Sequence, residues 1–273
     1  MNKMKPGICI LSILLSYMLF NPSLLADVTN NHARLIALDV KEGQAILLQH
    51  KNRGILIDTG HAGEALQLLK KLEQYGVSQL QAVIFTHLHP DHASAYFRIK
   101  EAFPLSRFYS NCQPIQINRA PDISRWVADD LQNNPAHQCL NADDRLSFAD
   151  TELDILWPDK IEGNNLNYNS LVIHIKMNRR DYLLMGDADL NVEKKLLKSG
   201  RLPQNIDALV VGHHGWHDAS SDALLKQLKP SRAVISINAN NARGYPHSSV
   251  LQRLQHYGVE ISRTDHHGDI HLQ

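Results

Sequence analysis

Four side chains that can bind a metal ion lie within six residues of this chain, directly after a short apolar segment. Residues 82–85 are apolar with a β-branched centre, which predicts a buried strand. His87 and His89 follow it two residues apart, so on an extended chain both rings project to the same side. The end of this strand is therefore a predicted metal site.

The other two ligands follow a turn. Pro90 stops the strand and Asp91 suits the start of a helix, which turns Asp91 and His92 towards a neighbouring point. Imidazole and carboxylate ligands suit zinc, and also manganese or iron. One histidine here would be typical of a polar surface loop, but four ligands in the order H-x-H-x-D-H indicate a metal site.

The order strand, aspartate, helix, strand, histidine occurs twice in the chain. The first half contains, in order, strand 54–57, Asp58, helix 64–74 and strand 82–85 with its histidines. The second half contains strand 182–185, Asp187, helix 192–198 and strand 208–211, followed by His213 and His214. Two such halves packed face to face would bring both sets of strand ends to one edge, where open α/β sheets place their sites.

Further segments complete one α/β domain. Strands 35–40 and 44–49 are predicted to form a hairpin, and the alternating segment 169–176 should pair with strand 182–185. Residues 260–268 are predicted to form a last hairpin. The least regular part, 100–150, contains one predicted helix at 123–132.

The first 26 residues have the pattern of a secretory signal peptide. Lys3 and Lys5 precede the apolar run Ile8–Phe20, and the small residue Ala26 follows. The run is shorter than the roughly 20 apolar residues that span a bilayer. We therefore predict a signal at 1–26, one domain at 27–273 with no stable membrane span after cleavage, and a periplasmic or secreted location. Leu24 makes the cleavage site imperfect, so an uncleaved anchor is the alternative.

The charge and the cysteines restrict the function further. After the signal the chain has a net charge of −2 with histidine neutral. A protein that coats nucleic acid usually has an excess of basic residues, and this chain has none. Cys112 and Cys139 remain as an even pair, and in an oxidising compartment they would form a disulfide. Two buried free thiols are the alternative. Neither cysteine is close in sequence to the histidine cluster.

The motifs together resemble the metallo-β-lactamase fold superfamily, and within it the soluble hydrolase domain of ComEC-type DNA-uptake proteins. The stretches that carry the resemblance are Leu38-Asp39-Val40, Gly43-Gln44-Ala45, Leu56–Gly60, Thr86–His92, Asn169–Val172, Leu183–Asp187, Val210–Gly215, Pro246-His247 and Arg263-Thr264-Asp265. This resemblance implies a four-layer αββα sandwich with one or two metal ions at its edge.

The resemblance also implies a ligand set. His87 and His89 would hold one ion, Asp91 and His92 a second, and Asp187 would bridge them. The last ligand of the family is a histidine before a glycine, which favours His214 over His213. A further family histidine, expected shortly before the strand that leads to Asp187, is replaced by the asparagine-rich stretch 164–169, so the first site is one protein ligand short.

The implied cofactors are two divalent metal ions, with Zn²⁺ favoured by the histidines and Mn²⁺ as the alternative. Such an ion lowers the pKa of bound water from 15.7 towards about 7. Asp91 would act as a base, and His247 would donate a proton or contact a phosphate. Two alternatives remain: His247 is an exposed residue before a helix, and Asp58 is either a turn cap or the group that orients a ligand histidine.

Three functions are consistent with these residues. The first is an exported hydrolase of phosphodiester bonds or of another small hydrolysable substrate, with single-stranded DNA or a nucleotide as the candidate. The second is hydrolysis of a β-lactam, lactone or thioester, against which the missing histidine counts. The third is a non-enzymatic binding module in DNA uptake or envelope assembly, against which the intact ligand cluster counts.

Overall fold

Two seven-stranded mixed sheets are stacked against each other in the computed structural model, which describes residues 32–104, 106–116 and 120–272. The first sheet contains, in spatial order, β14 (Ile270–His271), β1 (Arg34–Ala37), β2 (Ile46–His50), β3 (Arg53–Ile57), β4 (Gln79–Ile84), β5 (Arg107–Ser110) and β6 (His137–Cys139). The second contains β13 (Glu260–Arg263), β12 (Arg232–Ile235), β11 (Ala208–Val210), β10 (Arg180–Leu184), β9 (Val172–Met177), β8 (Thr151–Trp157) and β7 (Arg145–Phe148).

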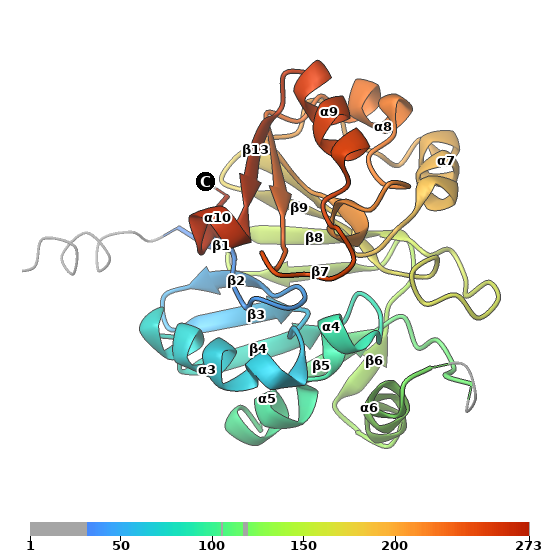
Figure 1. Cartoon of the computed structure of the whole chain (residues 1–273). Helices are drawn as coiled ribbons and strands as arrows, with labels where there is room; N and C mark the ends of the chain where they lie inside the picture. The colour runs from blue at the N-terminus through green and yellow to red at the C-terminus, as the bar shows by residue number, and fades with distance from the viewer. Residues whose placement is uncertain (1–31, 105, 117–119, 273) are drawn as a thin grey trace, which may run out of the picture. The chain divides into compact units, whose positions relative to one another are not determined.

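Helices cover the outer face of each sheet (Figure 1). Those over the first sheet are α3 (Ala65–Gln74), α4 (Pro90–Ala93), α5 (Tyr96–Ala102) and α6 (Asp122–Gln132). Those over the second are α7 (Leu190–Ser199), α8 (Asp222–Leu228) and α9 (Ser248–His256). The short elements are η1 (Ala62–Glu64), η2 (Gly212–Gly215) and α10 (Thr264–His267). The result is the four-layer αββα sandwich expected from the sequence.

Alternation along the central strands produces the layers. In β2, Ile46 and Leu48 belong to the core between the sheets, whereas Leu47 belongs to the core under α3 and α5. In β10, Tyr182 faces the second sheet's inner core and Leu183 faces the helices. Successive side chains point to opposite faces of a strand, so a continuous apolar run is buried on both sides. Three apolar cores, one between the sheets and one under each layer of helices, therefore fix the positions of the two sheets.

Most predicted elements are confirmed, and one is wrong. The hairpin of β1 and β2 and the pairing of β9 with β10 are both antiparallel, as expected. The predicted last hairpin does not form, because β13 pairs with β12 in the second sheet and β14 pairs with β1 in the first. The helical turn α10 carries the chain from one sheet to the other.

The predicted signal peptide at 1–26 lies outside the described residues and stays a prediction. Within the described part of the chain, none of the helices combines the length and the apolar character needed to cross a membrane.

The irregular region 100–150 is closed on itself by a disulfide and joined to the second half of the chain by a hydrogen bond. Cys112, just after β5, is bonded to Cys139 at the end of β6, as the sequence predicted. The neighbouring Asn111 donates from Nδ2 to the carbonyl oxygen of Asn169 at 2.6 Å. The disulfide therefore fixes a segment that contacts the asparagine-rich loop before β9.

We expect that replacing both Cys112 and Cys139 by alanine lowers the free energy of unfolding by about 3 kcal/mol, because the bond closes a loop between residues 27 apart in sequence. Urea denaturation of the mature protein measures this. Reduced wild-type protein should match the double variant. Two titratable thiols in denatured, unreduced mature protein would refute the bond.

Candidate metal centre

The predicted ligands meet where strands of the two sheets end. The chain leaves β4 at the His87–His92 segment, β10 at Gly186-Asp187 and β11 at η2. Two of these approaches require a close backbone fit at a glycine. A Cβ on Gly186 would lie 2.2 Å from Ser170 Oγ, and one on Gly43 would lie 1.8 Å from the carbonyl oxygen of Asp91. Both glycines also have positive φ, so a larger residue would displace the ligands beside them.

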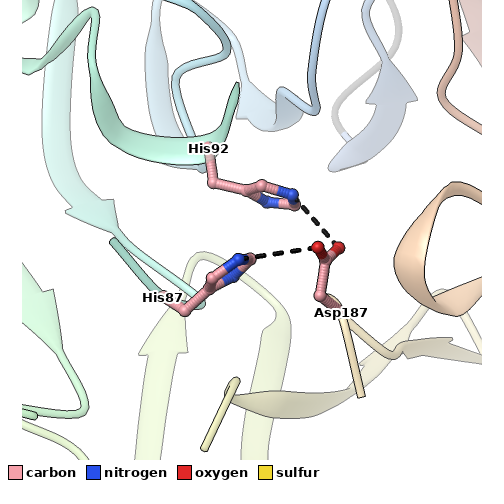
Figure 2. A group of neighbouring side chains, drawn as sticks. All are labelled: His87, His92 and Asp187. Atoms are coloured by element: carbon pink, nitrogen blue, oxygen red, sulfur yellow. Dashed lines mark ion pairs between the residues drawn. The ribbon is translucent and has the colours of Figure 1, made fainter. Parts of the chain in front are cut away.

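Asp187 lies between two groups of histidines. Its Oδ2 is 3.6 Å from His87 Nε2, and its Oδ1 is 3.1 Å from His92 Nε2, with both rings turned to the carboxylate (Figure 2). His89 Nδ1 is 3.0 Å from His87 Nε2 on the first side. This arrangement suits a carboxylate that bridges two ions, as the sequence predicted for Asp187.

A second group lies on the His92 side of Asp187. His214 Nε2 is 3.2 Å from His92 Nε2, 3.5 Å from Asp91 Oδ2 and 3.8 Å from Asp187 Oδ1. His92, His214 and Asp187 are buried, and Asp91 is nearly so. All six residues predicted to bind metal are therefore brought together, with His214 rather than His213 beside Asp91.

The tautomers of two rings test whether a cation fits here. His92 Nδ1 is 2.8 Å from Asp58 Oδ2, and His214 Nδ1 is 2.9 Å from the carbonyl oxygen of Ser236. Both partners only accept hydrogen bonds, so both Nδ1 atoms carry the hydrogen. In neutral rings the two facing Nε2 atoms are then lone pairs, which repel at 3.2 Å unless a proton or a metal ion binds between them. The donor set fits a divalent ion.

The electrostatics agree with this fit. Burial favours the neutral form of Asp187, yet His92, His87 and His214 hold the pKa of its carboxyl well below the usual range. Burial lowers the pKa of the His87 imidazole well below its ordinary value, and His92 lowers it further. Burial also lowers the pKa of His89. Burial opposes a charge on His92 and His214 as well, but Asp187, together with Asp58 for His92 and Asp91 for His214, raises the pKa of both rings above its ordinary value. Beside the ionised carboxylate, His87 and His89 are therefore neutral, whereas His92 and His214 favour the protonated form, and a metal ion would displace those protons.

Comparison with known proteins agrees with this geometry. The sequence model of the metallo-beta-lactamase superfamily matches residues 38–239. The chain belongs to this superfamily. It is therefore a metallo-hydrolase by family, and the metal centre lies where the superfamily motifs converge.

The relatives cover most of this chain. ComE operon protein 3 of Bacillus subtilis is 26% identical over 254 residues, which is 85% of this chain and 32% of that protein. Recombination protein 2 of Haemophilus influenzae is 30% identical over 240 residues, which is 86% of this chain and 28% of that protein. The chain thus spans about a third of the length of the curated relatives it matches.

Solved structures show the same fold. The metallo-beta-lactamase fold protein YhfI of Bacillus subtilis superposes with a TM-score of 0.58 and 13% identity, covering 88% of this chain and 99% of that chain. A diphosphatase from the PhnP family gives a TM-score of 0.50 and 13% identity, covering 88% and 97%. At this identity the likeness establishes the fold alone.

Asp58 has the orienting position that the sequence left open. It is fully buried, and besides His92 its carboxylate accepts hydrogen bonds from the Thr86 amide at 2.7 Å, the Thr86 hydroxyl at 2.8 Å and Gln44 Nε2 at 2.9 Å. A carboxylate held by four donors cannot move, so it fixes the His92 ring with Nε2 towards Asp187. This favours the orienting role over a plain turn cap.

His247 lies apart from the cluster. Its Nδ1 accepts from the Ser249 amide at 3.2 Å and contacts the Ser249 hydroxyl at 2.7 Å, so the side chain caps α9. Its ring lies 5.9 Å from that of His217, between centroids. The structure thus places His247 as the cap of α9, and its catalytic role stays a prediction.

One feature of the site has no motif in the sequence, and a second differs from the role that the sequence motif suggested. One is a cleft of ≈ 290 Å³ beside Asp91 and His214, bounded by Glu42-Gly43 and by the loop 237–245. From that loop Arg243 Nη1 reaches within 3.5 Å of Asp91 Oδ2. The other is His213, whose ring lies close to Asp187 and Asn167. Loop residues carry no periodic pattern, so only the fold brings them to the centre.

We expect Asp58→Asn to weaken metal binding by roughly 10- to 100-fold, because the amide no longer accepts the His92 hydrogen as a carboxylate does. Chelator competition with Zn²⁺ measures the change. Asp181→Asn is the matched control, since Asp181 also pairs with a histidine, His174, at 2.7 Å but lies outside the centre. Equal affinity in the Asp58 variant and the control would contradict the orienting role.

Proposed function

We propose that this chain is an exported, metal-dependent phosphodiesterase that acts on DNA or nucleotides. The observation that carries the proposal is the position of Arg243, whose guanidinium borders the cleft 3.5 Å from Asp91 of the metal centre. A guanidinium forms two parallel hydrogen bonds with phosphate oxygens, so an arginine beside a metal centre suits a phosphate substrate.

We assign the bound cofactor to two positions. His87, His89 and Asp187 would hold one divalent ion, and Asp187, Asp91, His92 and His214 the other. Such ions supply Lewis acidity for the phosphoryl oxygens and lower the pKa of a bound water molecule. The imidazoles favour zinc, and the carboxylates also suit manganese.

Asp91 lies where it can position a water molecule. Burial favours its neutral form, but the hydrogen bond to His214 and the charge on His92 lower the pKa of the carboxyl. The group is therefore ionised at neutral pH and accepts a hydrogen bond from water. Its Oδ2 also faces Arg243, so substrate phosphate and water would meet at the same carboxylate.

The wall of the cleft suits a nucleotide. The Tyr245 ring is nearly parallel to that of His214, at 19° and 6.1 Å between centroids, and Tyr245 also lines the cleft. Asn238, Asn240 and Asn241 line it as well and offer amide donors and acceptors. Local recognition of this kind supports binding of phosphate by a chain whose net charge is near zero.

Two further observations support DNA as the substrate and export as the route. Relatives that cover most of this chain are named as competence and recombination proteins. The Cys112–Cys139 bond is typical of an oxidising compartment such as the periplasm. The asparagine-rich loop in place of the further family histidine counts against a β-lactamase.

We expect the mature protein to hydrolyse bis(p-nitrophenyl) phosphate with Zn²⁺ or Mn²⁺ and to lose this activity with a chelator. Asp187→Ala and His89→Ala should both fall to the chelator background, because each removes a ligand, while circular dichroism remains native. Asp189→Asn is the control: Asp189 only caps α7, and asparagine caps equally well. No turnover with either metal would overturn the proposal and favour lactam or thioester substrates, or a binding role.

We expect Arg243→Ala to raise the KM for the phosphodiester roughly tenfold, with a smaller change in kcat, because a charged hydrogen bond to the phosphate is lost. Steady-state kinetics separate the two constants. Arg98→Ala is the matched control, since the Arg98 side chain is 60% exposed against 62% for Arg243 but lies on α5. An unchanged KM in Arg243→Ala would show that the arginine does not bind substrate.

A further inference from the structure

The first metal position lacks a ligand. The pattern of the family leaves only His87, His89 and Asp187 there, because the stretch 164–169 contains no histidine. Three protein ligands are the usual set for an open catalytic zinc site, but here one of them is a carboxylate shared with the second position. The structure brings another imidazole to this position from the opposite half of the domain.

His213 points to the first position. Its Nε2 is 4.0 Å from Asp187 Oδ2, the same carboxylate oxygen that faces His87. Its amide donates to the carbonyl oxygen of Gly186 at 3.0 Å, which ties the backbone of His213 to the residue before Asp187.

The backbone conformation explains how adjacent histidines serve two positions. His213 and His214 both have left-handed backbone, with φ of 49° and 53°. This conformation costs about 1 kcal/mol or more for a non-glycine residue and clusters at functional sites. Here it turns one ring to Asp187 Oδ2 and the next to Asp91 and His92. A helical or extended dipeptide would not aim both rings into one cluster.

The second nitrogen of His213 faces a carboxylate. Nδ1 lies 3.6 Å from Asp218 Oδ1, just beyond hydrogen-bond distance. Both atoms are buried and have no hydrogen-bond partner among the described residues. A histidine that binds metal usually directs its other N–H to a carboxylate, which leaves the remaining nitrogen for the ion. His213 has this arrangement.

Asn167 also contacts the His213 ring. Its Nδ2 donates to His213 Nε2 at 3.1 Å when the ring carries its hydrogen on Nδ1, so a metal ion bound at Nε2 would replace this hydrogen bond. The Asn167 Oδ1 is buried without a partner in the described part of the chain. Asn167 lies in the stretch where the family carries its own histidine, so the loop and His213 reach the same point.

We propose that His213 Nε2 is the missing protein ligand of the first metal position, with Asp218 as the group that orients its ring. The double histidine before Gly215 then supplies one ligand to each ion. The proposal concerns the metal centre and not the substrate, so its test measures bound metal rather than turnover.

The test compares the metal content of matched variants. Chelator-stripped mature protein is loaded with Zn²⁺, desalted and measured by elemental mass spectrometry. Wild-type protein should retain two ions per chain and His213→Asn one, since asparagine tolerates the left-handed backbone but lacks the imidazole. His217→Asn, which changes an exposed histidine in the next turn, should retain two. Two ions with unchanged affinity in His213→Asn would overturn the proposal, as would a single ion in wild-type protein.

Two further experiments extend the test beyond the metal content of the single variant. In Co²⁺-loaded wild-type protein, the His213 Nδ1 hydrogen should give a paramagnetically shifted, exchangeable resonance that is absent from His213→Asn. The double variant His213→Asn/Asn167→His should regain the second ion, because it supplies an imidazole from the loop. A folded double variant with one ion, or wild-type protein without that resonance, would contradict the assignment.

Discussion

The structure depends on one buried carboxylate surrounded by imidazoles. Asp187 is almost completely buried, and His87, His92, His213 and His214 all face it within 4.0 Å. An isolated buried charge would cost many kcal/mol, so the site is stable only with compensating positive charge. Protons on His92 and His214 supply that charge in part, and divalent ions would replace those protons on the same nitrogen lone pairs.

The two sheets hold the two halves of this cluster in register. His87, His89, Asp91 and His92 follow β4 of the first sheet, whereas Asp187 and His214 follow β10 and β11 of the second. The apolar core between the sheets fixes their separation, because close-packed interiors transmit displacement rather than absorb it. A shift of one sheet against the other would therefore separate the two halves of the metal centre.

Local strain is concentrated at the same edge. Asp58, His213 and His214 all have positive φ without being glycine. Asp58 is held there by hydrogen bonds from Thr86 and Gln44, and the histidines by the backbone bond from His213 to Gly186. Surrounding contacts thus impose conformations that the residues themselves disfavour, and each of them aims a side chain into the centre.

The types of ligand and the order of the secondary-structure elements could be predicted from the sequence. The H-x-H-x-D-H cluster, Asp187 and His214 follow apolar strands, so the strand pattern alone placed them at strand ends, and the repeated order of elements placed both halves at one edge. The prediction of a last hairpin at residues 260–268 was wrong for a physical reason. Strand pairing across sheets is a long-range choice, and residues 260–268 carry turn chemistry that suits either a hairpin or a crossing through α10.

The orientation of the side chains at the site depends on the packing of the two halves and could not be predicted from the sequence. Asp58 became the partner of His92, Arg243 reached Asp91 from a loop more than 150 residues away, and His213 turned towards Asp187 instead of the protein core. Periodicity reports which face of a strand or helix a residue occupies, whereas loop residues have no period. Their direction depends on backbone angles and close contacts that form only when the two halves pack together.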